Sequence, residues 1–469
     1  MIAKTMTFAL VLLSAGCALQ TFESRPLDPA RSQAALVAIS PRDPALRDAL
    51  ARQGIDVDRW PLANWDLAAL TALAYALRAD LAAARAEQTT VETERGTARA
   101  SRNPGVDLTT EHHSLRGNNG SPWSFGLALD LPLTGASRRA ARGAQADAKA
   151  REARWVVAQR AWQVRSEIRD IYTRWHFSRM AAAALEAERA LRAWETALIE
   201  KRLAVGAVSG VEPARARQRE AGAARLVDAA NGAVQRARNE LAQAVGLAPE
   251  VFDGLTLAAL PVESPQAPRS ELLQRTALHD RLDVRAALER YASSEAALQL
   301  EIARQIPELS IKPGYAWDQG DNRWSLGLSM LLPLFDRNAG PIAQARAQRE
   351  AQAARFLALQ ARAIAELHAA QQLAATARSD LDAARSLQAR EAEIAARVER
   401  RLAAGEADRL EQVGALISDA AARRRVIDAQ AASWKAFGTL EDAVQRPLNE
   451  IPASTDDSPD LAGNLTHTR

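Results

Sequence analysis

The residues with the most obvious chemical potential are three neighbours, Glu111, His112 and His113. Imidazole nitrogens and carboxylate oxygens are common ligands of divalent metal ions. The alternating pattern just before them predicts a β-strand, in which neighbouring side chains point to opposite faces. The two histidines therefore cannot easily share one ion, and we expect them to lie among polar headgroups or along a water-filled lumen. The sequence predicts no metal site here.

Three further histidines, His176, His279 and His368, are isolated in helical stretches, and we expect them to be structural. The chain has no Ser-His-Asp pattern, no phosphate-binding glycine loop and no cysteine-rich zinc pattern. We therefore expect no catalytic residues, no cofactor and no enzyme.

The single cysteine, Cys17, follows an N-terminal stretch that reads MIAKTMTFALVLLSAG. One lysine and a short apolar run are typical of a secretory signal and too short to span a bilayer. The context L-S-A-G-C resembles the bacterial lipoprotein signal, which implies that Cys17 becomes the lipidated first residue, carrying palmitate. Because Ala18 rather than aspartate follows, the resemblance also implies sorting to the outer membrane. The alternative is an ordinary cysteine within a signal peptide.

The composition favours long helices over a large globular core. Only 5% of the 469 residues are aromatic, and the formal net charge is +3. Basic and acidic residues alternate at helical spacing, which is typical of a solvated helix face and not of a nucleic-acid-binding surface. No nucleic-acid partner is expected.

The chain repeats itself with a period of about 200 residues, and we interpret this as a tandem duplication. Asn103-Pro104 matches Ile306-Pro307, Trp123 matches Trp324, and Arg202-Leu203-Ala204-Val205-Gly206 matches Arg401-Leu402-Ala403-Ala404-Gly405. The expected organisation is a signal peptide (1–16), an N-terminal anchor arm (17–64), a first repeat (65–246), an equatorial linker (247–270), a second repeat (271–441) and a polar C-terminal tail (442–469).

Each repeat is predicted to have the same order of elements. A helix comes first, at about 66–102 with Asp66 as its N-cap, and at about 271–305 with a break near Asp283. Two strands and a hairpin loop follow. A very long helix is then expected at about 138–204 and 341–403, with heptad apolar positions, and a return helix at about 210–246 and 409–441. Capping boxes are predicted at Ser209–Glu212 and at Asp408–Glu411.

The strand segments combine an apolar face and a polar face. Residues 123–133 read WSFGLALDLPL and residues 324–332 read WSLGLSMLL, with large apolar residues at every second position. Such alternation, with aromatic residues near the strand ends, is typical of outer-membrane β-barrels, although an extracellular sandwich strand alternates similarly. Four strands cannot enclose a lumen, so closure requires other copies of the chain. The residues expected to face the membrane are Trp123, Phe125, Leu127, Leu129, Tyr315, Trp317, Trp324, Leu326 and Leu328.

Together these features resemble the TolC-like outer-membrane efflux family, over about residues 60–445. The resemblance rests on the helix–Asn-Pro–strand junction, the strands that end in L-P-L, the long helices and the glycine-tipped hairpins. It implies a mostly α-helical fold with a small antiparallel β part. It also implies a homotrimer with a transmembrane barrel of twelve strands, four from each chain, and a coiled-coil tunnel across the periplasm. The segments Leu131–Arg142 and Leu332–Gly340 are more similar to the cobalt–zinc–cadmium (CzcC-like) branch.

The resemblance also assigns a role to the two hairpin tips. In this family the tips meet a periplasmic adaptor and form the tunnel entrance. Here they correspond to Val205, Gly206 and Ala207, and to Ala404, Gly405 and Glu406; the second tip departs from the pattern by the charge of Glu406. Threefold symmetry would turn an inward acid into a ring, so Glu406 and Asp408 are candidate gate residues, although helix capping explains Asp408 about as well.

The leading functional hypothesis is a passive exit duct of a tripartite efflux system. The resemblance implies a periplasmic adaptor protein and an inner-membrane transporter of the resistance-nodulation-division type as partners, with divalent heavy-metal cations as cargo. A multidrug or type I secretion channel is the alternative within this class. The rival from another class is a lipid-anchored periplasmic coiled-coil scaffold without a pore.

Overall fold

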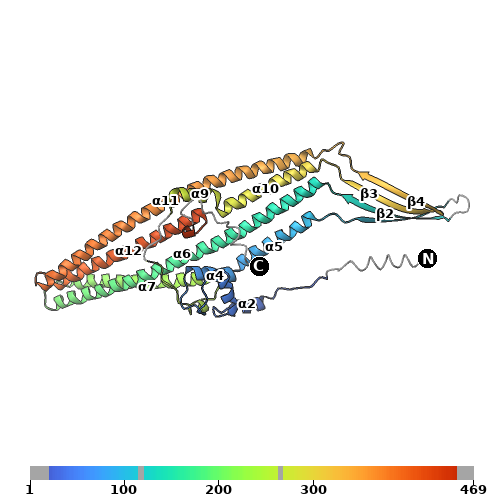
Figure 1. The fold of residues 1–469 in the computed structure, drawn as a ribbon. Coiled ribbons are helices and arrows are strands. Elements are labelled where there is room, and N and C mark those ends of the chain that lie inside the picture. The colour runs from blue at the N-terminus through green and yellow to red at the C-terminus, as the bar shows by residue number, and fades with distance from the viewer. Residues whose placement is uncertain (1–20, 115–120, 262–267, 451–469) are drawn as a thin grey trace.

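The chain forms an elongated molecule with strands at one end and helical tips at the other, as the computed structural model shows (Figure 1). The structure describes residues 21–114, 121–261 and 268–450. The expected signal peptide, Cys17, the loop Gly117–Gly120 and the chain from residue 451 onward lie outside this described part. The described part of the chain thus offers two kinds of candidate functional surface, those of the helices and those of the sheet.

The two halves of the chain follow the same order of elements, as the repeated sequence predicts. The first half contains α4 (Leu67–Leu77), α5 (Ala79–Arg99), β1 (Gly105–His112), β2 (Trp123–Leu133), α6 (Ala136–Ala204) and α7 (Val211–Val245). The second contains α9 (Ser270–His279), α10 (Leu282–Ala303), β3 (Leu309–Asp318), β4 (Asp321–Met330), α11 (Ala339–Ala403) and α12 (Arg409–Val444). The helices α2 (Pro29–Val37) and α3 (Pro44–Ala51) precede them, α8 (Pro249–Phe252) lies between them, and the 3-10 helix η1 (Leu448–Glu450) follows.

The two long helices determine the length of the molecule. α6 has 69 residues and α11 has 65, so each is about 100 Å long at 1.5 Å per residue. Alanine, leucine, arginine and glutamate, which have high helix propensity, dominate both helices. α6 packs against α5, α7, α10 and α12, and heptad residues such as Val164, Ile168, Ile171 and Trp175 are buried along it.

The first helix of each half is broken. We expected one helix over residues 66–102, but α4 ends at Leu77 and α5 begins at Ala79, with an angle of 56° between them. Arg78 is extended there (ψ 120°), and its side chain is bonded to groups far along the chain. In the second half the break lies at Asp280 and Arg281, close to the expected position.

Of the two predicted capping boxes, the one at Ser209–Glu212 is wrong, and the one at Asp408–Glu411 is confirmed in its N-cap, while the Glu411 carboxylate pairs with Arg401 instead. Asp408 is the N-cap of α12, and its carboxylate accepts bonds from the backbone N–H of Leu410 (2.7 Å) and Glu411 (2.9 Å). The N-cap of α7 is Gly210, which has no side chain to bond, and the Glu212 N–H donates to the Ser209 carbonyl instead. Asp66 caps α4 as predicted, 2.8 Å from the Ala69 nitrogen.

The apolar core is concentrated midway along the molecule. The larger cluster joins α3, α4, α6 and α7 to the linker and contains Trp65, Tyr172 and Phe252. A smaller cluster around Leu273, Leu367 and Leu448 joins α9, α11, α12 and η1. No single helix within the described ranges has both the length and the apolar composition to cross a membrane; the bent pair α4–α5 meets these two criteria jointly, by length and composition only.

Candidate functional site

The strands of both halves form one antiparallel sheet in the order β1-β2-β3-β4. β2 pairs with β3 over Phe125↔Trp317 and Leu127↔Tyr315, so the two halves meet in the middle of the sheet. Within residues 21–114, 121–261 and 268–450, β1 and β4 each have a strand partner on one side only. The sheet of a single chain therefore has two open edges.

One face of this sheet is apolar across all four strands. Leu108 lies opposite Leu127, Leu127 opposite Tyr315, and Tyr315 opposite Trp324. In the same register, one face carries Trp123, Phe125, Leu127, Leu129, Tyr315, Trp317, Trp324, Leu326 and Leu328, all the residues that we expected to face the membrane. Several are largely exposed, for example Trp324 at 83%. Among the residues that the structure describes, no layer covers this face.

The opposite face is polar or carries small residues. Lys312 Nζ lies 3.1 Å from Asp130 Oδ2, and Arg323 Nη1 lies 2.7 Å from Asp318 Oδ2. Gly314 and Ser325, which lie opposite each other, add no bulk. A water-filled path along this face would meet fixed charges of both signs.

The two neighbouring histidines point to opposite faces, as the strand geometry predicts. The ring of His112 packs against Trp123, with centroids 4.6 Å apart. His113 Nε2 lies 3.0 Å from Ser124 Oγ and 3.8 Å from Asp318 Oδ1 on the polar face. The Ser124 hydroxyl donates to Asp318 rather than to His113, which is not the arrangement of a nucleophile activated by histidine. Among the described residues no group of three or more potential ligands is placed to hold a metal ion.

At the opposite end of the molecule, both hairpin tips have the same backbone geometry. Gly206 and Gly405 adopt φ values of 71° and 78°, the left-handed conformation in which helices commonly end at glycine. The Ala207 N–H donates to the Arg202 carbonyl and the Glu406 N–H to the Arg401 carbonyl, each at 2.8 Å. This pattern satisfies helix-end carbonyls by a Schellman motif.

The two tips are joined to each other by one ion pair. Arg202 Nη2 on the first hairpin lies 2.8 Å from Asp408 Oδ2 on the second. The backbone N–H of Glu411, followed by the Arg202 guanidinium, lowers the pKa of the Asp408 carboxyl below its usual value. Asp408 is thus both a helix cap and a partner of Arg202. Glu406 is exposed beside it, and its role in gating remains a prediction.

Two arginine clamps at the helix breaks were missed by sequence reasoning. Arg78 donates to Asp80, to Glu167 and to the Ala244 carbonyl (3.2 Å). Arg281 repeats this arrangement with Asp283, Glu366 and the Ala443 carbonyl (2.8 Å). The hydrogen bond from Arg78 lowers the pKa of Asp80 well below its usual range. The only signal in the sequence was Arg-x-Asp at matching places in the two repeats, Arg78–Asp80 and Arg281–Asp283.

A third buried arginine connects the two halves. Arg169 of α6 is 4% exposed and lies 2.6 Å from Asp442 Oδ2 and 3.2 Å from Glu441 Oε2 of α12. Its pKa is raised although burial opposes the charge, because Asp442 more than compensates. A Cβ on Gly438 would lie 2.6 Å from Arg169 Nε, so this approach requires a glycine.

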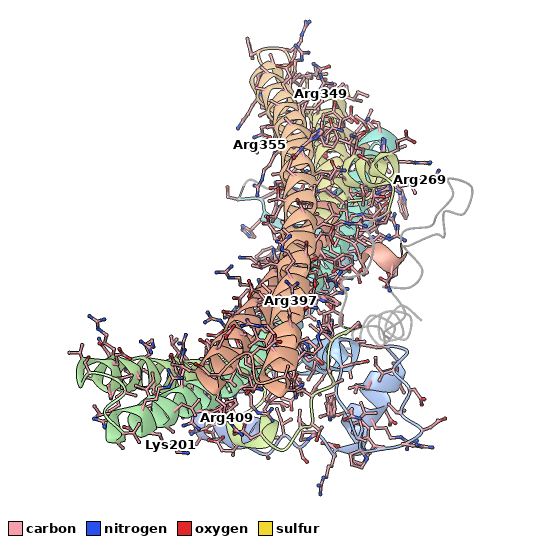
Figure 2. All side chains as sticks on the ribbon, turned by 90° about the vertical axis from the view of Figure 1, so that its left-hand side faces the viewer. Lys201, Arg269, Arg349, Arg355, Arg397 and Arg409 are labelled. Atoms are coloured by element: carbon pink, nitrogen blue, oxygen red, sulfur yellow. The ribbon has the colours of Figure 1, made fainter. Side chains whose placement is uncertain are left out.

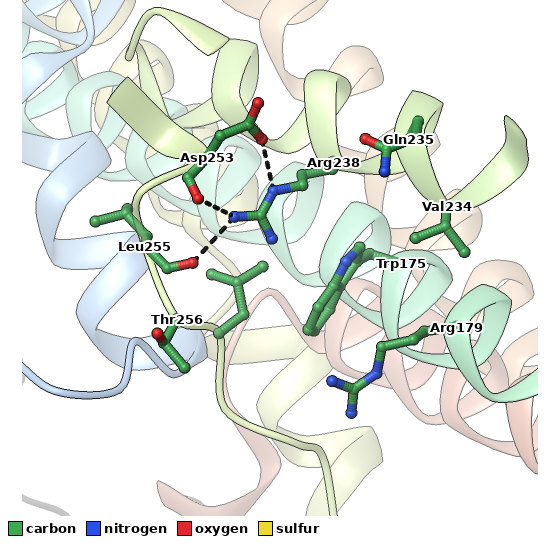
Figure 3. A pocket seen from close by; sticks show the side chains of 9 residues that line it. Trp175, Arg179, Val234, Gln235, Arg238, Asp253, Leu255 and Thr256 are labelled. Carbon is green, nitrogen blue, oxygen red and sulfur yellow. Dashed lines mark hydrogen bonds and ion pairs between the residues drawn. The ribbon is translucent and has the colours of Figure 1, made fainter. Parts of the chain in front are cut away.

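A hollow of ≈ 450 Å³ lies between α6, α7 and the linker (Figure 3). Arg238 dominates it, donating 2.7 Å to Asp253 Oδ1 and 3.0 Å to the Leu255 carbonyl. On the other side the Arg179 guanidinium lies 5.2 Å from the centre of the Trp175 ring. The arginine bonds hold the linker against α7, which is a structural role.

Comparison with known proteins gives the family. The family model for outer membrane efflux proteins matches residues 70–247 and 273–444, and this chain belongs to that family. The two matched stretches coincide with the two halves of the fold. The cobalt-zinc-cadmium resistance protein CzcC of Cupriavidus metallidurans is 28% identical over 242 residues. That alignment spans 49% of this chain and about half, 55%, of CzcC.

Solved structures of outer-membrane channels share the fold. VceC of Vibrio cholerae matches with a TM-score of 0.66 at 19% identity, over 83% of this chain and 100% of VceC. The Campylobacter jejuni channel CmeC matches with a TM-score of 0.66 at 14% identity, over 96% of this chain and 98% of CmeC. CusC, at 17% identity and a TM-score of 0.66, matches over 92% of this chain and 100% of CusC. The TolC-like architecture of helices and sheet is therefore confirmed.

Proposed function

We propose that this protein is the passive exit duct of a tripartite efflux system, crossing the outer membrane and the periplasm. The observation that carries the proposal is the sheet, which has one exposed apolar face, one polar face and two open edges. Its strands continue, through short connections, into helices about 100 Å long. Lipid against the apolar face and water against the polar face would satisfy both surfaces.

The open edges support a homotrimer. In hydrocarbon an unpaired strand edge is prohibitively costly, so β1 of one chain must pair with β4 of another. Three chains would contribute twelve strands, whereas two would contribute eight, which leaves a lumen barely wide enough for side chains. The protein extracted in detergent should therefore have the mass of a trimer, and a stable monomer with native spectra would contradict this assembly.

The ends of the duct have different partners in this proposal. The tips at Val205–Ala207 and Ala404–Glu406 dock on the periplasmic adaptor, which connects them to an inner-membrane transporter of the resistance-nodulation-division type. Cys17 carries the lipid anchor. Replacing Cys17 with serine should abolish palmitate labelling, while trimers that reach the membrane keep their barrel; labelling that persists would exclude Cys17 as the attachment site.

The proposed cargo is divalent heavy-metal cations such as cobalt, zinc and cadmium. The support is the 28% identity with CzcC, a cobalt-zinc-cadmium resistance protein. A wide duct with walls of mixed charge would let hydrated cations pass without tight ligation, which would slow their exit. Selection would then lie in the inner-membrane pump.

Two experiments test the proposal. Purified protein in a planar bilayer should show discrete conductance, whereas a periplasmic scaffold without a pore would show none. Deletion of the gene should lower the inhibitory concentrations of cobalt, zinc and cadmium more than those of organic drugs. Unchanged metal tolerance with lost drug tolerance would assign the duct to a multidrug system.

A further inference from the structure

The corner between β4 and α11 exposes a run of large apolar side chains. Leu331, Leu332, Leu334 and Phe335 follow the last residue of β4, and Phe335 is 102% exposed. Leu332 continues the alternation of β4 onto the apolar face, Leu331 falls on the opposite parity, and Leu334 and Phe335 lie beyond the strand. On a mobile loop such side chains could turn inward and become buried. If the corner is held in place, they stay exposed unless something outside the chain covers them.

Hydrogen bonds hold this corner in place. Asn338, which has φ 61°, donates from Nδ2 to the Glu301 carbonyl (2.7 Å) and to Glu301 Oε2 (2.9 Å). The Arg337 carbonyl accepts a bond from Gln305 Nε2 (3.2 Å), and Asp336 Oδ1 accepts one from the Asn338 N–H (2.8 Å). The backbone that follows Phe335 is therefore anchored to the end of α10. A fully exposed phenylalanine beside an anchored backbone favours an apolar environment outside the chain.

Positive charge gathers beside the same corner. Arg138, Arg139 and Arg142 lie in the first two turns of α6 and Arg346 in the first two turns of α11, and neither helix has an acidic residue in its first turn. Arg138 is paired with Glu308. Within the described part of the chain, Arg139, Arg142, Arg337 and Arg346 have no ion pair. Cations are disfavoured at helix N-termini, so helix stability does not explain them.

The position of the corner connects the two features. Arg138 also donates to the Ala303 and Arg304 carbonyls at the end of α10, the same helix end that holds Asn338. The start of α6 and the corner thus meet at the end of α10 that adjoins the strands (Figure 1). Farther along α11 lie two more basic residues, Arg349 and Arg355 (Figure 2).

We propose that Leu331–Arg337 with Arg139, Arg142 and Arg346 forms an interfacial anchor for the membrane leaflet nearest the helices. Phe335 and the leucines enter the boundary between headgroups and acyl chains, and the four arginines bind anionic phospholipid headgroups. Aromatic residues at that depth and basic residues beside an apolar surface are the two features that hold proteins at such a boundary. The inference rests on the proposed membrane-spanning sheet. It adds that the end of the sheet nearest the helices binds anionic phospholipids.

Fluorescence quenching tests the apolar half of the anchor. In a Cys17→Ser background, Phe335→Cys is labelled with bimane, and the protein is reconstituted with lipids that are spin-labelled either near the headgroup or near the chain end. Matched sites are Leu326→Cys on the apolar face and Val205→Cys at the tip. We expect shallow labels to quench position 335, deep labels to quench position 326, and neither to quench position 205.

Lipid binding tests the basic half. The fourfold variant Arg139→Gln, Arg142→Gln, Arg337→Gln, Arg346→Gln should bind phosphatidylglycerol at least roughly tenfold more weakly than the wild type. The control changes Arg215, Arg225, Arg236 and Arg409 to glutamine in the hairpins, with the same loss of charge, and should bind as the wild type does.

The outcomes separate this inference from the proposed function. Quenching at 326 without quenching at 335 would overturn the anchor and leave the membrane-spanning sheet intact; if Phe335→Ser then also lowers the yield of trimer, a second copy of the chain covers the corner. Equal lipid affinity of the two fourfold variants would overturn the role of the arginines. Absence of quenching at both 326 and 335 would overturn the anchor together with the proposed function.

Discussion

Arg202 Nη2 and Asp408 Oδ2 are 2.8 Å apart, and this ion pair joins the tip of the first hairpin to the tip of the second. The partners are separated by 206 residues. Both are partly exposed, so the pair contributes only about 0.5 kcal/mol to stability. Its consequence is the spacing of the tips, because it joins residues near the ends of two different hairpins.

Removing this pair should widen the tunnel entrance. We expect Arg202→Gln to raise single-channel conductance in a planar bilayer about twofold or more, because the two tips are then free to separate. The control is Arg217→Gln, which breaks the pair with Glu200 inside one hairpin (2.7 Å) and should leave conductance unchanged. Equal conductance of both variants would show that the tips are held by other contacts.

A side chain at Gly206 or Gly405 should destabilise the hairpin tip. Gly206→Ala or Gly405→Ala places a Cβ on a residue with positive φ, at a cost of about 1–2 kcal/mol, although the space around both is open. Hydrogen exchange should accelerate at the tip amides while the trimer survives. Gly222→Ala, in open space within α7, should be neutral or stabilising by up to ~1 kcal/mol. Loss of the whole fold would contradict an isolated tip.

The contact between Arg169 and α12 predicts that alanine substitution will destabilise the protein at one glycine of α12 and not at another. Gly438→Ala forces Arg169 away from Asp442 and should lower the free energy of unfolding by about 2–3 kcal/mol. Gly414→Ala, in open space on the same helix, should not destabilise. Thermal unfolding in detergent measures both, and a stable Gly438→Ala protein would contradict the close approach.

The buried ion pairs of Arg281 at the second helix break should contribute more to the free energy of unfolding than an exposed ion pair beside them. Arg281→Gln leaves Asp283 and Glu366 without their buried partner and should cost about 3 kcal/mol. Arg285→Gln removes an exposed pair with Asp280 (2.9 Å) and should cost less than about 1 kcal/mol. Similar melting temperatures for both variants would mean that the break is held by packing alone.

His176 should make the equatorial core sensitive to acid. Burial, followed by the charge of Arg179, lowers the pKa of His176, and its Nδ1 accepts a bond from the Leu260 N–H (3.4 Å). The unfolded chain then binds the proton more readily, so the stabilisation is complete above about pH 6.5 and is lost as pH falls toward the lowered value. We expect His176→Phe to flatten the fall in melting temperature between pH 7.5 and 5.5, and His368→Gln, on an exposed position, to leave it unchanged.

Local patterns in the sequence determined much of this fold. The alternation in residues 123–133 and 324–332 predicts strands with an apolar face, and the structure confirms both, because the period of a strand depends only on neighbouring residues. Gly206, Gly405 and Asp408 predict helix ends for the same local reason. Heptad spacing predicts the buried stripe of α6.

Only the tertiary structure decided which distant residues meet. Ser209 and Asp408 are both good N-caps by residue type, yet only Asp408 caps its helix, since the preceding backbone decides where a helix begins. Arg78 and Arg281 break their helices because carboxylates and carbonyls more than 80 residues away accept their hydrogen bonds. The pairing of β2 with β3 likewise joins strands from different halves. Such contacts depend on how long helices and strands are placed in space, which no local period encodes.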